Sequence, residues 1–512
     1  MTNFLLRHIS SWYQPQPTTV FLVNGLLEYQ ALHFIQLSTY VLGEPKSIII
    51  VTEIQISKAS LVALDRLFPT TNYQFIELKN HWSNHILFKL VRLVLITPFA
   101  LLLSFLTNRS SLIQSSYPWL LSQIMHGVWD LSQRYAPNNI VTPSLKDKYL
   151  AALSNLTQLS KSAHYTLAFR PALIFLGHSV YAGRSSMAFY RMLPIPIYAH
   201  SFHALNKVAP HSDSSVFTPT KLESKAFLKI VRQLDPTTFW EDRKAGHSNY
   251  YDARNSFIGI KTTDTTPANI IYLHIYRDSP FNHIDRTRIF ADYFHWTLET
   301  LRVLKNSNET WLIKTHPTST RWGEDSLAIT YRLLSTVFPT GLPEHILIDE
   351  STLSNSSLLS HARRIITFSG SVHLEAAAHS IKPIVISSTL LEAIDPSLVF
   401  KPSTMATYTS LLLTPSRSPD FHLSYDQTLL SRQILQLKEN YLTYGDDFNI
   451  MPLYPSDSLD YQSQVLESFI RSSLDASQFT RRLAYYLANG LTRSTSSRIL
   501  DSFYHLMNQS SS

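Results

Sequence analysis

The segment of residues 365–386 constrains the fold most strongly. It contains a short apolar run, a turn of small residues, an alanine-rich stretch and a second apolar run. This order predicts a buried strand, a tight turn, a short helix and another buried strand, which is the repeating unit of an α/β protein with a parallel sheet. The turn places Ser369, Gly370 and Ser371 at the positive end of the helix, where backbone N–H groups favour an anion. We therefore expect these three residues to hold a phosphate group.

Two other positions point to the same kind of ligand. Glu375 lies one helical turn beyond the serine turn, where a carboxylate can accept hydrogen bonds from the two hydroxyls of a ribose. A predicted strand upstream, at residues 310–314, ends close to His316, and Pro317 favours an extended backbone at that histidine. Because open α/β sheets bind ligands along the carboxyl edge of their strands, we expect the two strand ends to share one crevice.

Four segments, in order along the chain, resemble bacterial capsule polysaccharide biosynthesis glycosyltransferases. They are residues 271–280, 292–301, 314–317 and 369–383, and the similarity covers about residues 265–410. The likeness is to the group that includes the capsular Kdo transferases. It implies the fold class α/β with a GT-B architecture, in which two Rossmann-like domains face each other across a cleft and C-terminal helices brace the first domain.

The resemblance also implies an activity. A sugar would pass from a nucleotide-sugar donor, with a CMP-sugar such as CMP-Kdo favoured, to a glycan or lipid-linked acceptor. In GT-B transferases that use CMP-activated sugars, a His-Pro motif and a serine-containing turn contact the nucleotide and its phosphate, which implies these roles for His316, Ser369 and Ser371. The family's turn more often reads Gly-Ser or Gly-Thr before Leu-Glu, whereas this chain has Ser-Gly-Ser-Val-His. Glu375 matches the acidic residue that contacts ribose in related enzymes.

Length and composition agree with two domains. A chain of 512 residues with 44% hydrophobic residues is too long for one ordinary core and has enough apolar material for two. We expect an N-terminal Rossmann-like, acceptor-side domain at residues 1–245 and a polar linker at 246–268. A nucleotide-sugar-binding Rossmann-like domain would follow at 269–420, with C-terminal helices and a tail at 421–512.

Apolar runs in the first half predict its strands. They lie at residues 18–23, 47–52, 165–169, 173–176 and 196–199, with a helical stretch after the first. A strand, a helix and a second strand in this order form a right-handed βαβ unit.

A general base for an inverting transfer would come from the first domain. His178, His200 and Glu28 each follow a predicted strand that would end at the cleft, where a base could reach an acceptor hydroxyl. The chain contains 21 histidines, so a surface or hydrogen-bonded structural role is the alternative for either histidine.

Two further side chains could contact the donor. Asp278 follows a predicted strand of the second domain, although Asp-Ser-Pro is also a good turn or helix-cap sequence. Arg184 could clamp a sugar carboxylate or a phosphate bidentately, with an ordinary surface arginine as the alternative. The predicted nucleotide-sugar site as a whole consists of His316, Pro317, Ser369, Gly370, Ser371, Glu375, Asp278, Lys314 and Arg184.

We expect no metal and no cofactor besides the nucleotide-sugar co-substrate. Cysteine is absent, so the chain can form neither a disulfide framework nor a thiolate metal site. The spacing of His200 and His203 lacks an acidic third ligand nearby. The resemblance likewise implies an inverting, metal-independent enzyme.

Charge and apolar runs bear on partners and location. The net charge of +7 comes from scattered basic residues, which argues against nucleic acid. The first residues carry no secretory pattern, so the cytoplasm is the expected location. Residues 86–106 are almost wholly apolar apart from Lys89 and Arg92, but their charge-free part is too short to span a membrane and contains Pro98.

Two interpretations of residues 86–106 stay open. They could lie on the anionic inner face of the cell membrane, as a peripheral contact of an enzyme with a lipid-linked acceptor, or form two short buried helices of the first domain. Two other functions stay open as well: a polyol-phosphate or sialic acid transferase on the same fold, and a non-catalytic GT-B scaffold in polysaccharide assembly.

Overall fold

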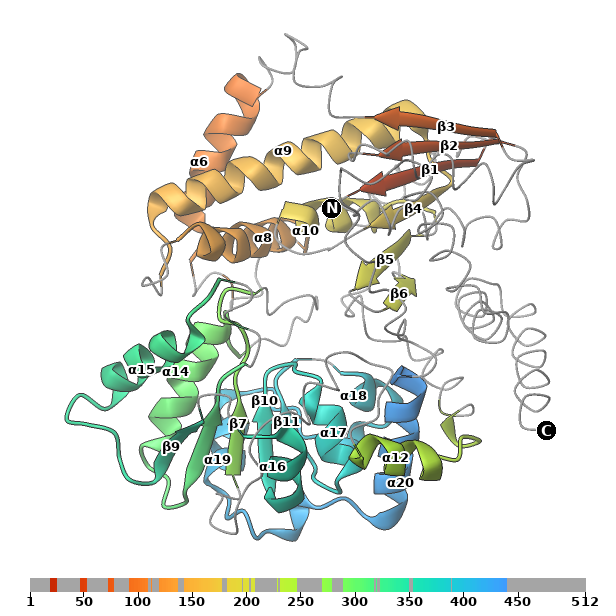
Figure 1. The fold of residues 1–512 in the computed structure, drawn as a ribbon. Coiled ribbons are helices and arrows are strands. Elements are labelled where there is room, and N and C mark those ends of the chain that lie inside the picture. Colours follow the sequence, from red (N-terminus) through yellow and green to blue (C-terminus); the bar gives the residue numbers. More distant parts are fainter. Residues whose placement is uncertain are drawn as a thin grey trace, which may run out of the picture.

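Two separate sheets organise the chain, one in each half of the sequence (Figure 1). The computed structural model describes residues 19–24, 47–52, 72–77, 92–108, 112, 119–136, 142–176, 182–195, 197–201, 204–207, 228, 231–245, 269–278, 289–316, 319, 323–349, 353–387 and 389–439.

The first sheet has six strands in the order β3-β2-β1-β4-β5-β6. Its neighbouring strands pair in parallel except β5 and β6, which form an antiparallel hairpin. The chain adds strands on one side of β1 and then crosses to the other side for β4, so the strand order reverses between β1 and β4. The strands are β1 (Thr19–Asn24), β2 (Ser47–Thr52), β3 (Asn72–Glu77), β4 (Leu173–Leu176), β5 (Ile197–Ser201) and β6 (Ala204–Lys207).

A group of helices belongs to this first unit. A π-helical turn, η1 (Arg92–Ile96), continues directly into α6 (Thr97–Leu106), and α8 (Trp119–Tyr135) follows. The long helix α9 (Leu145–Phe169) begins at a capping box formed by Ser144 and Asp147, and it ends at Arg170, whose φ of 43° lies in the left-handed region. The last helix of the group is α10 (Ala182–Tyr190). Buried apolar side chains of α6, α8 and α9 form a common core.

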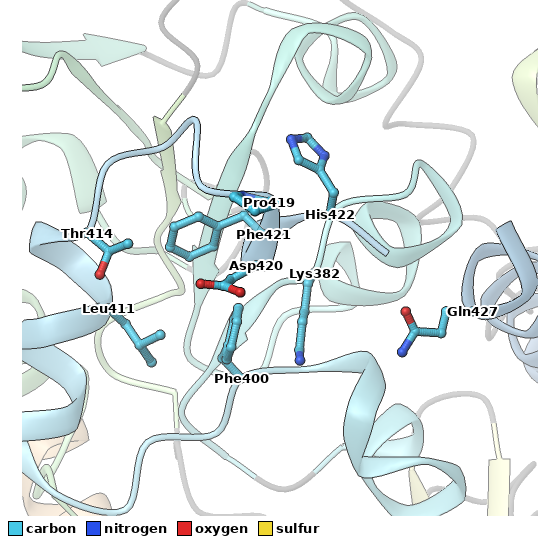
Figure 2. A pocket seen from close by; sticks show the side chains of 9 residues that line it. All are labelled: Lys382, Phe400, Leu411, Thr414, Pro419, Asp420, Phe421, His422 and Gln427. Atoms are coloured by element: carbon cyan, nitrogen blue, oxygen red, sulfur yellow. The ribbon is translucent and has the colours of Figure 1, made fainter. Parts of the chain in front are cut away.

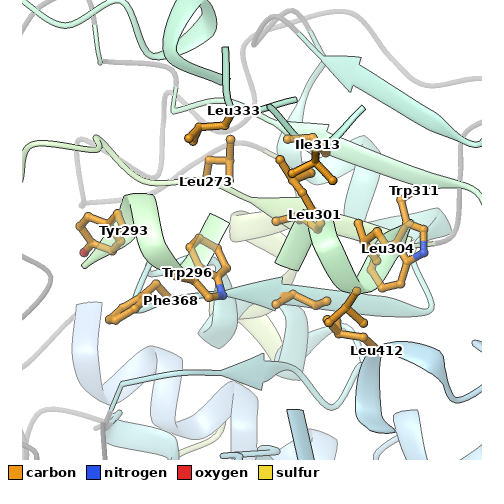
Figure 3. Packing of buried hydrophobic residues seen from close by; sticks show 14 of the residues in the cluster. Leu273, Tyr293, Trp296, Leu301, Leu304, Trp311, Ile313, Leu333, Phe368 and Leu412 are labelled. Atoms are coloured by element: carbon orange, nitrogen blue, oxygen red, sulfur yellow. The ribbon is translucent and has the colours of Figure 1, made fainter. Parts of the chain in front are cut away.

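The second sheet has five parallel strands in the order β11-β10-β7-β8-β9. Four of its strands are buried along their whole length, as expected when helices cover both faces of a parallel sheet. Figure 3 shows part of the apolar cluster that α14 forms with the strands, including Trp296, Leu301 and Ile313. The strands are β7 (Asn269–Tyr272), β8 (Trp311–Lys314), β9 (Ile346–Asp349), β10 (Arg364–Thr367) and β11 (Ile384–Val385).

Most helices of the second unit begin at a side-chain cap. The hydroxyl or carboxylate of Asp292, Asp325, Thr389, Thr404 or Ser424 accepts a bond from a backbone N–H of the first turn. The helices are α14 (Tyr293–Leu304), α15 (Ser326–Val337), α16 (Asn355–His361), α17 (Val372–Ala378), α18 (Leu390–Ile394), η3 (Pro396–Leu398), α19 (Met405–Leu413), η4 (Pro419–Phe421) and α20 (Tyr425–Leu437).

Helix α12 (Thr237–Lys244) packs with this second unit. Its Trp240 is buried in a cluster with Leu374 of α17 and Leu435 of α20. The segment before residue 245 therefore contributes to the core around α17, although the predicted first domain extends to 245. The domain boundaries themselves stay a prediction.

One buried carboxylate links the two units. Asp292, the N-cap of α14, accepts hydrogen bonds from Trp129 Nε1 at 2.9 Å and Gln133 Nε2 at 3.0 Å, both from α8. Nearby, Arg277 donates to the carbonyl of Ala136 at 2.7 Å. The end of α8 is thus fixed to the beginning of α14.

The predicted fold class, α/β with two Rossmann-like domains, is confirmed by the two mainly parallel sheets. Their arrangement across a cleft stays a prediction. Of the predicted C-terminal helices, α20 packs on α17 and α12, and residues 440–512 lie outside the described part. The strand predicted at 165–169 is wrong, because these residues form the last turn of α9.

Candidate functional site

The carboxyl ends of three neighbouring strands carry the polar residues of the site. His274 follows β7, His316 follows β8, and Ser369 follows β10. These strands are adjacent and parallel, with β7 in the middle, so the three residues meet at one edge of the sheet. The strand order reverses between β7 and β10, and doubly wound sheets bind ligands beside such a reversal.

Aromatic contacts join these residues into one group. The ring of His274 stacks flat on Tyr293, with centroids 4.7 Å apart and an angle of 6° between the planes, and its centroid lies 5.3 Å from that of His316. The hydroxyl of Tyr293 lies 3.2 Å from the hydroxyl of Ser369. His274 Nδ1 is 3.9 Å from a carboxylate oxygen of Asp278. We call these five residues the strand-edge cluster.

Burial sets the charge of this cluster. Burial, together with the neighbouring His274, lowers the pKa of His316 to about 3, although the charge of Asp278 opposes the shift. Burial also lowers the pKa of His274, although Asp278 opposes the shift, and it raises the pKa of Tyr293. Both imidazoles are therefore neutral at neutral pH, and each offers one N–H donor and one acceptor nitrogen.

The turn after β10 is shaped by its neighbours. A Cβ on Gly370 would lie 3.0 Å from the hydroxyl oxygen of Thr367, which already accepts a bond from the Gly370 N–H at 3.2 Å. His373 Nδ1 donates to the carbonyl of Gly370 at 2.6 Å. Ser371 is the exposed N-cap of α17, and its hydroxyl does not cap the helix. A small residue at position 370 and a histidine at 373 thus hold the turn against the strand.

Glu375 has an ion-pair partner inside the protein. Arg243 of α12 contacts Glu375 Oε1 at 2.8 Å and Glu439 at 3.1 Å. Burial raises the pKa of Glu375, while the charge of Arg243 opposes that shift. The residue proposed for ribose therefore also fixes α17 to α12.

Two predicted cations are paired in the same way. Lys314 is buried and donates to the carboxylate of Asp349 and, at 2.7 Å, to the carbonyl of Leu353. Arg184 of α10 is only 2% exposed and contacts Asp130 of α8 at 3.1 Å. Each cation thus joins two neighbouring elements of secondary structure. Contacts of Lys314 and Arg184 with a sugar remain a prediction.

The remaining predicted residues are not placed in detail. Glu28, His178 and Pro317 lie outside the described residues. His200 lies in β5, but its side chain is not described. In the described part of the chain, no three His, Asp or Glu residues are grouped so that they could hold a metal ion.

Sequence reasoning did not identify Tyr293 as a site residue. It follows the N-cap Asp292 and lies 76 positions from Ser369. The available local signal is an aspartate that can cap a helix, Asp292, directly before it, but no short motif marks the contact. The roles of His373 and Arg243 were missed for a similar reason.

A separate pocket of about 340 Å³ lies away from the cluster (Figure 2). Lys382 precedes β11, and Phe421 lies under the guanidinium of Arg364, the first residue of β10, so the pocket adjoins the amino ends of the strands. The ammonium of Lys382 lies 4.2 Å from the ring centre of Phe400. This pocket is not part of the predicted site.

No protein-family model matches this chain, and no curated protein matches it. Among solved structures, the chain is similar to KpsC of Thermosulfurimonas dismutans, a beta Kdo 2,4 transferase, at 11% identity over 58% of this chain and 88% of that chain, with a TM-score of 0.31. It is also similar to UDP-GlcNAc 2-epimerase from Neisseria meningitidis bound to UDP-GlcNAc, at 10% identity over 82% of this chain and 98% of that chain (TM-score 0.28). It is similar as well to MurG of Acinetobacter baumannii, at 12% identity over 81% of this chain and 95% of that chain, with a TM-score of 0.26.

Proposed function

We propose that this chain is a GT-B glycosyltransferase that binds a nucleotide-sugar donor at the strand-edge cluster. The observation that carries the proposal is the meeting of His274, His316 and Ser369 at the carboxyl edge of the second sheet, beside the reversal of strand order. Neutral imidazole N–H groups and a hydroxyl can donate hydrogen bonds to phosphate oxygens there. Such groups bind a nucleotide phosphate through directed hydrogen bonds.

The same donors fit the chemistry of sugar transfer. The bond between the anomeric carbon and the phosphate oxygen breaks, and the nucleotide leaves with an additional negative charge. Donors that are already oriented stabilise this charge as it develops. We assign this role to His316 and Ser369, with Ser371 as a further hydroxyl at the exposed turn.

The acceptor would be activated from the first unit. Its hydroxyl loses a proton to a general base and attacks the anomeric carbon, so no covalent intermediate forms and the configuration inverts. His178, His200 and Glu28 are the proposed bases. No metal takes part in this scheme.

The donor nucleotide would be held at its ribose as well. Arg243 binds Oε1 of Glu375, so we propose that Oε2 accepts a ribose hydroxyl. Asp278, Lys314, Gly370, Pro317 and Arg184 complete the proposed site.

Within this class we propose a role in capsule polysaccharide assembly. The donor would be a CMP-sugar such as CMP-Kdo, the acceptor a glycan or a lipid-linked glycan, and the location the cytoplasmic face of the membrane. Support comes from the sequence resemblance over about residues 265–410 and, for the location, from the apolar residues 86–106 with their basic Lys89 and Arg92.

A panel of nucleotides tests the proposed donor class. CMP, CDP, UDP and GDP are each added to the full chain, and the melting temperature is recorded. A nucleotide present at about 100 times its Kd should stabilise the chain by about 2.7 kcal/mol. We expect one cytidine nucleotide to give the largest rise and His316→Ala and Ser371→Ala to reduce it.

The control is His361→Ala, because His361 is exposed on α16 and does not belong to the cluster. This variant should keep the full rise. No rise with any nucleotide would contradict a nucleotide-sugar enzyme, and an unchanged rise in His316→Ala would show that the site is misplaced. Nucleotide binding without turnover of any nucleotide sugar would favour a scaffold.

A further inference from the structure

The outer surface of η1 and α6 is apolar and exposed. Six large side chains are between 42% and 64% exposed there, although they belong to a helix with a well-packed inner side. We call these residues the α6 face; they are Val94, Leu95, Phe99, Leu101, Leu102 and Phe105.

The inner side explains why the helix is held in place. Ile96, Ala100 and Leu103 are buried against side chains of α8 and α9. A helix on the surface of a protein in water normally turns polar residues outward. Here both sides are apolar, and Figure 1 shows α6 at the outer margin of the first unit, beside α9. A contiguous exposed apolar surface of this kind indicates an interaction site.

An apolar groove continues the α6 face inward. It has a volume of about 590 Å³, and Leu95 and Phe99 form one of its sides. Leu120, Leu156 and Phe189 contribute from three other helices. The face and the groove thus form one continuous surface suited to hydrocarbon.

The sequence around this surface is mainly basic. Residues 78–129 contain no aspartate or glutamate, but they contain the four basic residues Lys79, Lys89, Arg92 and Arg109. In the described structure, Lys148 of α9 donates to the carbonyl of Thr107, at 3.2 Å, immediately after the end of α6. Basic residues beside an apolar face complement the negative charge of an anionic lipid surface.

We propose that the α6 face docks on an anionic lipid bilayer. Its large side chains would enter the boundary between headgroups and acyl chains, and the basic residues would contact the headgroups. None of the helices in the described part of the chain has the length and apolar character of a membrane span. A second copy of the chain fits less well, because it would bring two surfaces of the same charge together. The proposal does not rest on the nucleotide site, so the two can fail independently.

Vesicle sedimentation of the full chain tests the docking. Phosphatidylcholine vesicles are compared with equimolar phosphatidylcholine and phosphatidylglycerol at low salt, without nucleotide. We expect binding to the anionic vesicles and a marked loss at high salt, because salt screens the headgroup contacts. In the double variant Leu102→Ser/Phe105→Ser, the affinity for anionic vesicles should fall at least about tenfold, because two apolar side chains no longer move from water into the bilayer.

The matched control changes exposed leucines elsewhere. Leu342 and Leu347 of the second unit are 44% and 41% exposed, and Leu342→Ser/Leu347→Ser should bind vesicles like the wild type. Equal binding by both double variants would overturn the assignment to α6. Absence of vesicle binding by the wild type at low salt would overturn the docking itself. Circular dichroism confirms that the variants are folded.

The absence of cysteine allows a second, direct measurement. Phe105→Cys is labelled with a polarity-sensitive fluorophore, and Tyr425→Cys, at a position 80% exposed in α20, serves as the control. Anionic vesicles should shift the emission to the blue at position 105 and not at 425. A shift at 105 that depends on protein concentration without lipid would indicate self-association and contradict the proposal.

Discussion

The strand-edge cluster and the α6 face lie in different units and differ in chemical character. The cluster brings imidazoles, hydroxyls and a carboxylate together in a half-buried setting, whereas the α6 face leaves large apolar side chains in contact with water. The first suits a small polar ligand, and the second suits hydrocarbon. The two units are built on similar doubly wound sheets, so the difference between their surfaces comes from their loops and helices.

Helix α8 connects the two surfaces. Its Trp129 belongs to the core that supports α6 and also donates to Asp292. The residue after Asp292 is Tyr293, which stacks on His274 in the cluster. Substitutions in this link and in each surface therefore test whether the two surfaces depend on one another.

Loss of the link should have the largest effect on stability. Asp292 is fully buried, accepts from Trp129 and Gln133, and caps α14 through the His295 N–H at 2.7 Å. Asp292→Ala removes these bonds, two of which come from buried side-chain donors. We expect a loss of about 3 kcal/mol or more in the free energy of unfolding, measured in urea.

The matched control is Asp325, an exposed aspartate that caps a helix of the second unit. Asp325 caps α15 through the Ala328 N–H at 2.9 Å, and its side chain is exposed. Asp325→Ala should cost about 1 kcal/mol. Equal losses in the two variants would show that the contact between α8 and α14 adds nothing and that the two surfaces are energetically independent.

Acid should weaken the second unit through its buried histidines. Burial lowers the pKa of His373 to about 4 and that of His316 to about 3, whereas histidines of the unfolded chain titrate near 6.5. Between these values the unfolded chain binds more protons, so this stability is complete above about pH 6.5 and falls as the pH falls. Each such histidine should contribute a loss of about 2 kcal/mol by about pH 5.

Urea unfolding at about pH 7.5 and pH 5 measures this effect. His373→Asn should show a smaller loss between the two pH values than the wild type. Leu102→Ser/Phe105→Ser in the α6 face removes no titratable group and should keep the whole loss. A loss in His373→Asn as large as in the wild type would contradict a buried neutral imidazole at this position.

The sequence predicts most of the strands because their apolar runs are short and bounded by turns. The runs at 47–52 and 173–176 coincide with β2 and β4. Residues 165–169 also form an apolar run, but they continue a helix that begins at the capping box of Ser144 and ends at Arg170. A short run of this kind cannot be distinguished from a helix end by its periodicity alone.

The site could be predicted only as far as local sequence reaches. The sequence indicates His316 and Ser369 because each follows a predicted strand, and the parallel sheet brings these strand ends together. The ion pair of Glu375 with Arg243 joins positions 132 apart and depends on how α12 packs on α17. Such a contact follows from the tertiary structure and has no signal in a single sequence.

A calorimetric titration tests the proposed nucleotide site at the strand-edge cluster most directly. The nucleotide that raises the melting temperature most is titrated into the wild type, His316→Ala and the control His361→Ala. We predict that Kd rises at least about tenfold in His316→Ala, which is about 1.4 kcal/mol, and stays the same in His361→Ala. The same Kd in all three proteins would contradict a nucleotide site at the strand-edge cluster.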